Sequence, residues 1–260
     1  MSKYVFCDLD YTLLNNNKEV SNEDFLVIKD FEAKGNHFII NSGRAPFALK
    51  QYTDLLNSTD VITSNGALII SKGKIIKKEL LSKETVIPII KYAAENNMCL
   101  RIFTDDYLYI LNKEFAPNNE FMYEQRREIN ISEAYNLIDE IEIIKVAFSG
   151  EKEKIDIAKT DIMKMQLKVE LSFSSDYFLE INSLGQNKGN GIKDYCKLNN
   201  INIKDTISIG DNDNDISMLK VAGYSACPSN AIKKVKEIVN YVCINDNNHN
   251  AIKEILEKIN

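Results

Sequence analysis

The 260-residue sequence predicts an α/β protein that has a parallel-sheet core and an inserted α+β domain. Strand and helix patterns alternate in the first third of the chain, and the alternation returns near the C-terminus, which is typical of parallel sheets with crossover helices. Between these stretches, short turns join adjacent strand patterns, which indicates antiparallel pairing. We therefore expect residues 1–79 and 184–260 to form a Rossmann-like core domain, and residues 80–183 to form the inserted domain.

The first third of the chain reads as three buried strands separated by two helices. Residues 3–7 are a continuous apolar run, which suits a strand buried on both faces. Ser21, with Asp24 three residues later, is an N-cap signature for a helix that Gly35 ends. The remaining elements are a strand at 37–41, a helix through Leu49 and Leu56, and a strand at 61–64.

The other two parts of the chain are predicted from the same patterns. In the inserted domain we expect strands at 98–103, 107–111, 143–148, 167–173 and 177–181, with helices through Val86 and Ile90 and at 152–163. Near the C-terminus we expect helices at 190–198 and 216–221, and strands at 206–209, 224–227 and 241–244. A final helix carries Ile252, Ile255, Leu256 and Ile259 as one core-facing stripe.

Composition excludes several classes of function. A net charge of -6 argues against nucleic acid as the main partner, because binding to a phosphate backbone needs clustered Lys and Arg. The basic run at 72–78 is short and predicts a solvated hairpin. No apolar stretch is long enough to span a bilayer, so we expect no membrane partner. The five cysteines are scattered, which is typical of reduced thiols in a cytoplasmic protein.

Two acidic clusters lie near opposite ends of the chain, and each directly follows a predicted strand. They are Asp8-Leu9-Asp10-Tyr11-Thr12 and Gly210-Asp211-Asn212-Asp213-Asn214-Asp215. Ligands bind open α/β sheets at the carboxyl ends of the strands, so we expect the clusters to meet there. Carboxylates packed this closely repel one another unless a cation lies between them. The oxygen ligands favour a hard divalent ion such as Mg²⁺, which often keeps one face for a phosphate.

Two further features adjoin these clusters. The chain after Ser42-Gly43, which follows the second strand, can offer backbone N–H groups to an anion at a helix start. Cys7 precedes the first cluster, so a thiol nucleophile is an alternative, although no His lies nearby in the sequence to activate it.

Four motifs together resemble those of the haloacid dehalogenase-like hydrolases. They are Asp8-Leu9-Asp10-Tyr11-Thr12-Leu13, Ser42-Gly43-Arg44, Lys188-Gly189 and the stretch from Gly210 to Leu219. The chain most resembles the Cof-type phosphatases with a C2-type cap, because Asn65-Gly66-Ala67 and the position of the insert fit that subgroup. The resemblance implies a Mg²⁺-dependent phosphatase that hydrolyses small phosphorylated metabolites, sugar phosphates above all, through an aspartyl phosphate.

The resemblance also implies a role for each motif residue. Asp8 is the nucleophile, and Asp10 is the acid that protonates the leaving alcohol and then the base that activates water. Mg²⁺ binds Asp8, the backbone carbonyl of Asp10, and Asp211, while Asp215 supports the ion through water or Lys188. The phosphate oxygens are held by Leu9, Thr12, Ser42, Gly43, Lys188 and Asn214. Tyr11 departs from the pattern, since the family usually carries Gly there, and we expect it to crowd the turn and alter substrate fit.

Two other functions stay open at this stage. A sugar phosphomutase shares the nucleophile, and a sensor that binds phosphorylated ligands without catalysis shares the binding motifs. Because the motifs contact only phosphate and metal, substrate choice is expected to lie in the cap, where the sequence assigns no residue. The expected partner is a small phosphorylated metabolite, with no nucleic acid and no membrane, bound by a cytoplasmic monomer or homodimer.

Overall fold

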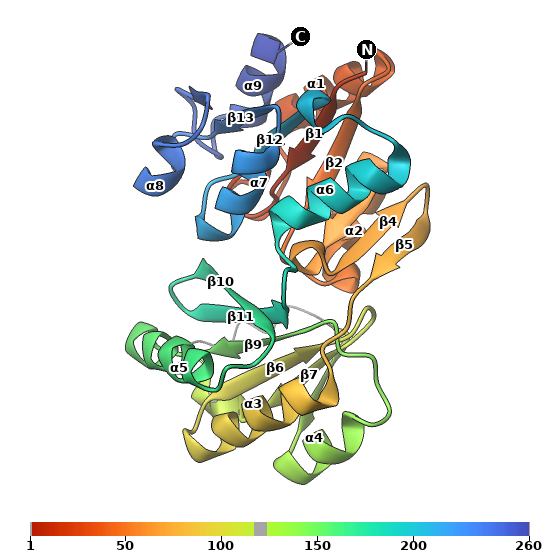
Figure 1. Cartoon of the computed structure of the whole chain (residues 1–260). Coiled ribbons are helices and arrows are strands. Elements are labelled where there is room, and N and C mark those ends of the chain that lie inside the picture. The colour runs from red at the N-terminus through yellow and green to blue at the C-terminus, as the bar shows by residue number, and fades with distance from the viewer. Residues whose placement is uncertain (1, 117–123, 260) are drawn as a thin grey trace. The chain divides into compact units, whose positions relative to one another are not determined.

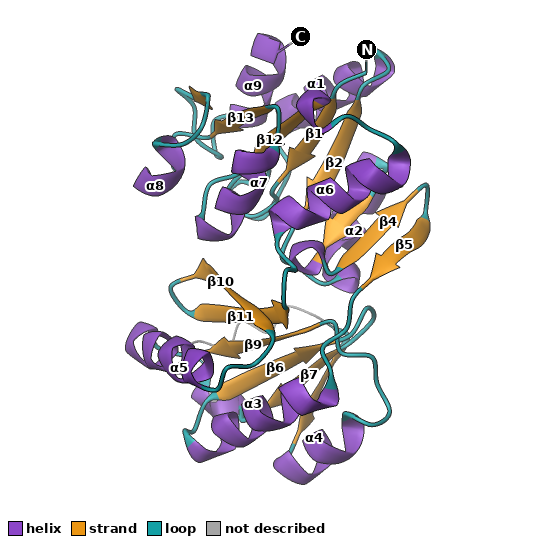
Figure 2. Ribbon diagram, viewed as in Figure 1, coloured by secondary structure: helices purple, strands orange, loops and turns teal. Residues whose placement is uncertain are grey.

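The computed structural model describes residues 2–116 and 124–259, and these form two compact units. The first unit comprises residues 2–43, 51–77 and 187–259, and the second comprises residues 44–50, 78–116 and 124–186. Each unit combines helices with a sheet (Figure 1; Figure 2). The predicted α/β class is therefore confirmed. Among the described residues, no helix is long and apolar enough to cross a membrane.

An eight-stranded sheet forms the centre of the first unit, in the order β14-β13-β12-β1-β2-β3-β4-β5. Its strands are β1 (Tyr4–Cys7), β2 (His37–Asn41), β3 (Val61–Thr63), β4 (Leu68–Ser71), β5 (Lys74–Lys78), β12 (Thr206–Ile209), β13 (Tyr224–Cys227) and β14 (Tyr241–Val242). The strands from β14 to β3 are parallel, and β4 runs antiparallel to β3. Because β1 lies between β2 and β12, strands from the N-terminal and C-terminal parts of the chain are neighbours near the centre of one sheet.

The described helices of this unit are α1 (Asn22–Ala33), α6 (Lys188–Asn199), α7 (Ile216–Val221), α8 (Lys233–Lys236) and α9 (Ala251–Ile259). Helix α2 (Pro46–Leu56) is divided, since its residues 51–56 belong to this unit and residues 46–50 to the other. Helices α6 and α7 pack against Phe6 and Ile39 on one face of the sheet, whereas the alternating neighbours Val5 and Cys7 point to the opposite face. Helix α1 begins as predicted, since the Ser21 hydroxyl accepts a 3.0 Å hydrogen bond from the Asp24 N–H. Helix α8 was not predicted, because a four-residue helix carries no periodic pattern.

The basic run at 72–78 forms the turn and second strand of a hairpin. Lys72 and Gly73 take positive φ angles of 51° and 71°, as a tight turn between twisted strands requires. The expectation that the whole run is solvated is wrong for its last two lysines. Lys77 is half-buried and forms a 2.6 Å ion pair with Asp194, while Lys78 is paired with two carboxylates.

The second unit contains a six-stranded sheet in the order β10-β11-β9-β6-β7-β8. Its elements are α3 (Lys83–Glu95), β6 (Cys99–Phe103), β7 (Leu108–Leu111), β8 (Arg126–Ile129), α4 (Ile131–Leu137), β9 (Lys145–Ser149), α5 (Lys152–Lys164), β10 (Val169–Ser175) and β11 (Phe178–Ser183). The predicted hairpins β6–β7 and β10–β11 are antiparallel. The pair β7–β8 is parallel and was not predicted, because three of the four β8 residues are charged and exposed.

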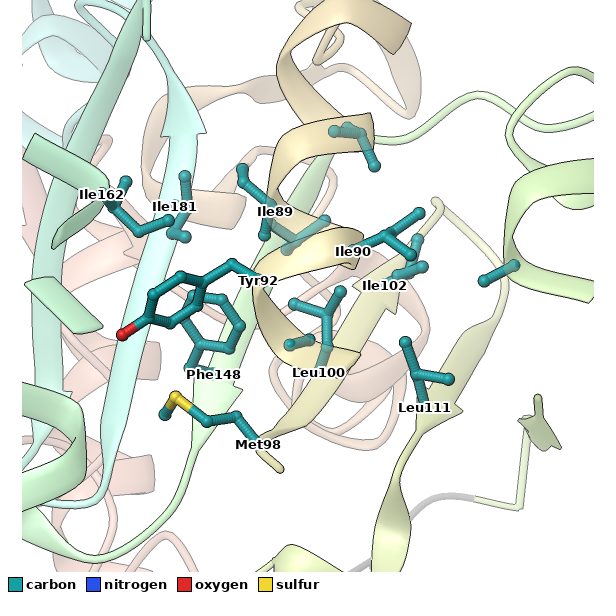
Figure 3. Packing of buried hydrophobic residues seen from close by; sticks show 14 of the residues in the cluster. Ile89, Ile90, Tyr92, Met98, Leu100, Ile102, Leu111, Phe148, Ile162 and Ile181 are labelled. Atoms are coloured by element: carbon teal, nitrogen blue, oxygen red, sulfur yellow. The ribbon is translucent and has the colours of Figure 1, made fainter. Parts of the chain in front are cut away.

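Apolar residues from one face of this second sheet pack against helices α3 and α5. Figure 3 shows Leu100, Ile102 and Phe148 of the strands interleaved with Ile89 and Ile90 of α3 and with neighbouring side chains. Because side chains alternate along a strand, the residues between these positions belong to the other face of the sheet. That face carries buried charged residues, including Lys145 and Glu180.

Candidate active site

The two acidic clusters meet where neighbouring parallel strands end. Cys7, the last residue of β1, lies beside Ile209, the last residue of β12. The N–H of Asp8 donates to the carbonyl of Ile209 at 2.8 Å, which fixes the start of the first cluster. Asp8, Asp211 and Asp215 each offer a carboxylate oxygen within 4.8 Å of the others, and all three are buried. The side chains that the sequence places about 200 residues apart therefore form one site.

Lys188 supplies a positive charge to this carboxylate group. It is the first residue of α6, it is fully buried, and its Nζ lies 2.5 Å from Asp8 Oδ1 and 2.6 Å from Asp215 Oδ1. Helix α6 can bring it there because Gly189 lies against α7. A Cβ at Gly189 would lie 2.3 Å from the Ser217 carbonyl oxygen, so no larger residue fits without moving the backbone.

The second cluster is folded around the carboxylate of Asp215. Its Oδ2 accepts hydrogen bonds from the N–H groups of Asp211 and Asn212 at 2.9 and 3.0 Å. A Cβ at Gly210 would lie 2.5 Å from the Asp215 side chain, so the loop can close only on glycine. Asp215 thus organises the loop through one oxygen and contacts Lys188 through the other.

The charges of this site do not balance. Burial, followed by repulsion from Asp215, raises the pKa of Asp8 well above its usual value. Burial and the same neighbour raise the pKa of Asp211 to about 7. Burial alone would lower the pKa of Lys188, but Asp215 and Asp8 raise it, so the ammonium stays charged. One cation faces three carboxylates, and the donor set of carboxylate oxygens fits a hard divalent ion such as Mg²⁺.

The remaining residues of the first cluster separate into two environments. The Thr12 hydroxyl donates to Asp211 Oδ1 at 2.6 Å, so it lies inside the site. The Leu9 side chain is fully buried, which leaves only its backbone to face a ligand. The Asp10 carboxylate lies outside the group of three carboxylates and is half-buried, with Lys18 Nζ 3.0 Å from its Oδ1. This lysine had no recognisable signal in the sequence, because it belongs to an ordinary polar turn.

The residues that the sequence predicts to bind an anion lie at the end of the neighbouring strand β2 and in the second cluster. Ser42 and Gly43 follow β2 and are buried. The N–H of Ser42 donates to the Ile62 carbonyl at 2.9 Å, so any amide offered to an anion must come from the chain after this residue, where the sequence places it. Helix α2 starts only at Pro46, and Pro has no N–H to offer. Asn214 lies half-buried in the short turn Asp213–Asp215, next to Asp215.

One buried residue near the site was missed in the sequence. Asn41 is fully buried at the end of β2, and its Nδ2 donates to the backbone carbonyl of Lys188 at 3.2 Å. It thereby ties the strand that precedes Ser42 to the helix that carries Lys188. The signal was available, since Asn41 is the one polar residue in the apolar run Phe38 to Asn41.

The alternative of a thiol nucleophile is not supported by the geometry. Cys7 is fully buried, and its thiol donates a hydrogen bond to the backbone carbonyl of Asp8 at 3.1 Å. Burial, followed by the charge of Asp8, raises the pKa of this thiol well above its usual value. A protonated thiol is a poor nucleophile, so Cys7 is a residue of the hydrophobic core and not a nucleophile.

Comparisons with known proteins agree with this geometry. A family model described as haloacid dehalogenase-like hydrolase matches residues 5–256. The chain is 27% identical over 275 residues to Phosphatase YwpJ of Bacillus subtilis (strain 168), covering 95% of this chain and 96% of that protein. It is 27% identical over 282 residues to 5-amino-6-(5-phospho-D-ribitylamino)uracil phosphatase YwtE of the same organism, covering 99% and 98%. A solved haloacid dehalogenase-like hydrolase from B. subtilis has a TM-score of 0.88 at 23% identity, covering 99% of this chain and 100% of that chain.

Proposed function

The chain belongs to the haloacid dehalogenase-like hydrolases and is a phosphatase, and we propose that it hydrolyses small phosphorylated metabolites, sugar phosphates above all, through an aspartyl phosphate on Asp8. One observation carries this proposal. Asp8 lies at the end of the central strand β1, paired with Lys188 and grouped with Asp211 and Asp215. The Asp8 carboxylate lies beside the Lys188 ammonium and beside carboxylates that could bind a metal ion, an arrangement that is suited to phosphoryl transfer.

The proposed metal ion is Mg²⁺, which Asp8, the backbone carbonyl of Asp10, and Asp211 would hold, with Asp215 supporting it through water or Lys188. When bound, it supplies positive charge that offsets the charge of the phosphoryl oxygens and of the carboxylates. Burial and the charge of Asp215 raise the pKa of Asp211 to about 7, which means that the ionised form of this carboxyl is disfavoured by the chain alone. A cation bound beside it would favour the ionised form, so the raised pKa supports this assignment.

The chemical steps are assigned to residues of the chain. An Asp8 oxygen attacks phosphorus, and the bond from phosphorus to the leaving alcohol oxygen breaks as Asp10 donates a proton to that oxygen. Asp10 then takes a proton from water, whose oxygen attacks phosphorus and releases inorganic phosphate and the free Asp8 carboxylate. Lys188 holds the Asp8 carboxylate in place and offsets its charge. The proposed phosphate ligands are Leu9, Thr12, Ser42, Gly43, Lys188 and Asn214.

We assign substrate choice to residues 80–183, because the motifs at the strand ends provide contacts only for phosphate and metal. YwtE acts on a phosphorylated ribitylamino-uracil, so this class of compound belongs in any substrate test beside sugar phosphates. We also propose a cytoplasmic location, which is supported by five free and buried cysteines.

A substrate screen with matched variants tests the proposal. The full chain with Mg²⁺ is assayed for inorganic phosphate release from phosphorylated sugars, nucleotides, pyridoxal phosphate and the ribitylamino-uracil phosphate. We expect release without any activating bisphosphate, which separates a hydrolase from a phosphomutase. Asp8→Asn should abolish release from every substrate. Equal phosphate release by Asp8→Asn and wild type would overturn the proposed nucleophile.

A further inference from the structure

Tyr11 has a backbone conformation that its residue type disfavours. Its φ angle is 59°, in the left-handed region where a Cβ meets the following carbonyl oxygen. Its side chain is 46% exposed, so burial of the ring does not explain why the strain is kept. Strained residues that persist next to a reacting group are a reason to look for a functional contact.

The contact is with Lys18, which lies in the turn that follows. Lys18 Nζ is 4.2 Å from the centroid of the Tyr11 ring and 3.0 Å from Asp10 Oδ1. The ammonium therefore touches both the aromatic face and the carboxylate. An ammonium over an aromatic face is attracted by the ring, and its hydrogen bond to a carboxylate is charge-assisted.

The backbone of Lys18 is fixed on both sides. Its N–H donates to the Asn15 carbonyl at 3.0 Å, and its own carbonyl accepts a 3.0 Å hydrogen bond from the Tyr52 hydroxyl of α2. Lys18 itself has a φ angle of 63°. Tyr11 and Lys18, both with positive φ angles, thus lie beside the Asp10 carboxylate. The Lys18 side chain contacts both Tyr11 and Asp10, and the two hydrogen bonds of the Lys18 backbone fix the position from which this side chain starts.

We propose that Lys18, supported by the Tyr11 ring, is a positioning residue for the Asp10 carboxylate. The inference rests on the proposed function, in which Asp10 gives a proton to the leaving oxygen. Asp10 lies outside the group of three buried carboxylates, and its side chain is 31% exposed. Lys18 restricts the rotamers of this carboxylate, and proton transfer is sensitive to small changes in the position of the acid.

A pair of similar substrates tests the role of Lys18. Phenyl phosphate has a basic leaving group that needs a proton, whereas p-nitrophenyl phosphate releases a stable phenolate. Because kcat/KM reports the steps up to phosphoryl transfer, it isolates the acid role of Asp10. We expect Lys18→Met to lower kcat/KM for phenyl phosphate about 10-fold, with a loss of at most about 3-fold for p-nitrophenyl phosphate. Lys18→Arg should recover most of the loss, and Tyr11→Leu should show the same selective loss at about 3-fold.

Lys29 provides the matched control. It pairs with Glu32 at 2.8 Å, lies 5.9 Å from the Phe25 ring, and is 33% exposed, compared with 30% for Lys18. Lys29→Met should leave kcat/KM unchanged for both substrates. Asp10→Asn should give a larger version of the selective loss seen in Lys18→Met.

Three results would overturn the inference. Equal losses for the two substrates in Lys18→Met would mean that Lys18 attracts the phosphate or supports the fold. An unchanged kcat/KM for phenyl phosphate would mean that Asp10 is positioned without Lys18. A lower Mg²⁺ concentration for half-maximal activity, with an unchanged ratio of the two substrates, would make Lys18 a counter-ion of the acidic site. In each case loss of activity in Asp8→Asn leaves the proposed function standing, so the two failures are distinguishable.

Discussion

Each unit buries a group of charged side chains, but the two groups differ in charge balance. In the first unit, Asp8, Asp211 and Asp215 face one cation, Lys188. In the second unit, two cations, Arg101 and Lys145, accompany Glu180. Lys145 and Glu180 form an ion pair with side chains that are 4% and 7% exposed. Arg101 lies over the Phe178 ring at 4.5 Å and donates to Ser149 Oγ at 3.3 Å.

This difference in charge balance indicates which buried group needs a cation from outside the chain. Burying a charge is costly unless a charge of opposite sign lies close to it. Only the first group has more carboxylates than cations, and there burial and mutual repulsion raise the pKa of Asp8 and Asp211. An excess of buried carboxylate is thus the physical sign of the proposed metal site, whereas burial of charge alone is not.

The largest expected effect comes from removing one carboxylate of the first group. Asp8→Asn should lower phosphate release by at least about 10³-fold, because the amide cannot serve as the nucleophile. Stability should stay the same or rise, since the change removes a buried charge that its neighbours repel. Steady-state kinetics and thermal unfolding measure both. A variant that loses activity together with its fold would leave the role of Asp8 without support.

Removal of the metal ion should affect the acidic group of the first unit and leave the buried ion pair of the second unit unaffected. We expect chelation by EDTA to lower activity by about 10²-fold or more and Mg²⁺ to restore it. At 100 times its Kd, Mg²⁺ should raise the free energy of unfolding by about 2.7 kcal/mol. Thermal unfolding with and without Mg²⁺ measures this gain. It should shrink in Asp211→Asn and persist in the matched control Glu180→Gln. Equal gains in both variants would show that the acidic group is not the metal site.

The Lys145–Glu180 pair of the second unit should respond as an ordinary buried ion pair. Glu180→Gln leaves the Lys145 ammonium without its carboxylate in a buried place, so we expect a loss of about 3 kcal/mol in the free energy of unfolding. Urea unfolding measures it. A loss below about 1 kcal/mol, the range of exposed pairs, would contradict the buried setting of this pair.

The smallest expected effect concerns a buried carboxylate that belongs to neither group. Burial raises the pKa of Asp24 to about 6, although the Lys253 N–H, 2.8 Å from its Oδ1, opposes the rise. The folded state therefore binds more protons than the unfolded state between about pH 4 and pH 6. Stability should fall across this window by about 2 to 3 kcal/mol as pH rises, and then level off.

The variant Asp24→Asn isolates this contribution. It keeps an oxygen acceptor for the Lys253 N–H and cannot titrate, so the pH-dependent loss should disappear. The difference in free energy of unfolding between wild type and variant, followed from pH 4 to pH 8, is the measurement. A constant difference across this range would show that Asp24 keeps its ordinary pKa in the folded state.

Much of the first unit could be predicted because its signals are local. The strand at His37–Asn41 and the helix at Ile216–Val221 have the predicted bounds, since apolar runs and caps define them. The meeting of the two acidic clusters followed from parallel strand order alone. Strand β8 and helix α4 were missed because both are short and have one buried residue each, although the capping box of Asn130 and Glu133 was a readable signal.

Contacts made by side chains across the fold could not be predicted in the same way. Arg101, Lys145 and Glu180 lie on three different strands of the second sheet, and only the strand pairing brings them together. Lys18 reaches Asp10 because two residues adopt positive φ angles that their types disfavour. Sequence patterns describe typical backbone conformations, so exceptions of this kind become visible only in the structure.

The assignment of Asp8 as the nucleophile can be tested most directly by trapping the phosphoryl group on the chain. In Asp10→Asn, p-nitrophenyl phosphate should still react, because its leaving group needs no acid, but water should attack the product slowly. Mass spectrometry of the denatured and digested protein during turnover then locates the added phosphoryl group. The account predicts one phosphoryl group on the peptide that contains Asp8. A phosphoryl group on another residue, or phosphate release by this variant with no phosphorylated peptide at any time, would contradict it.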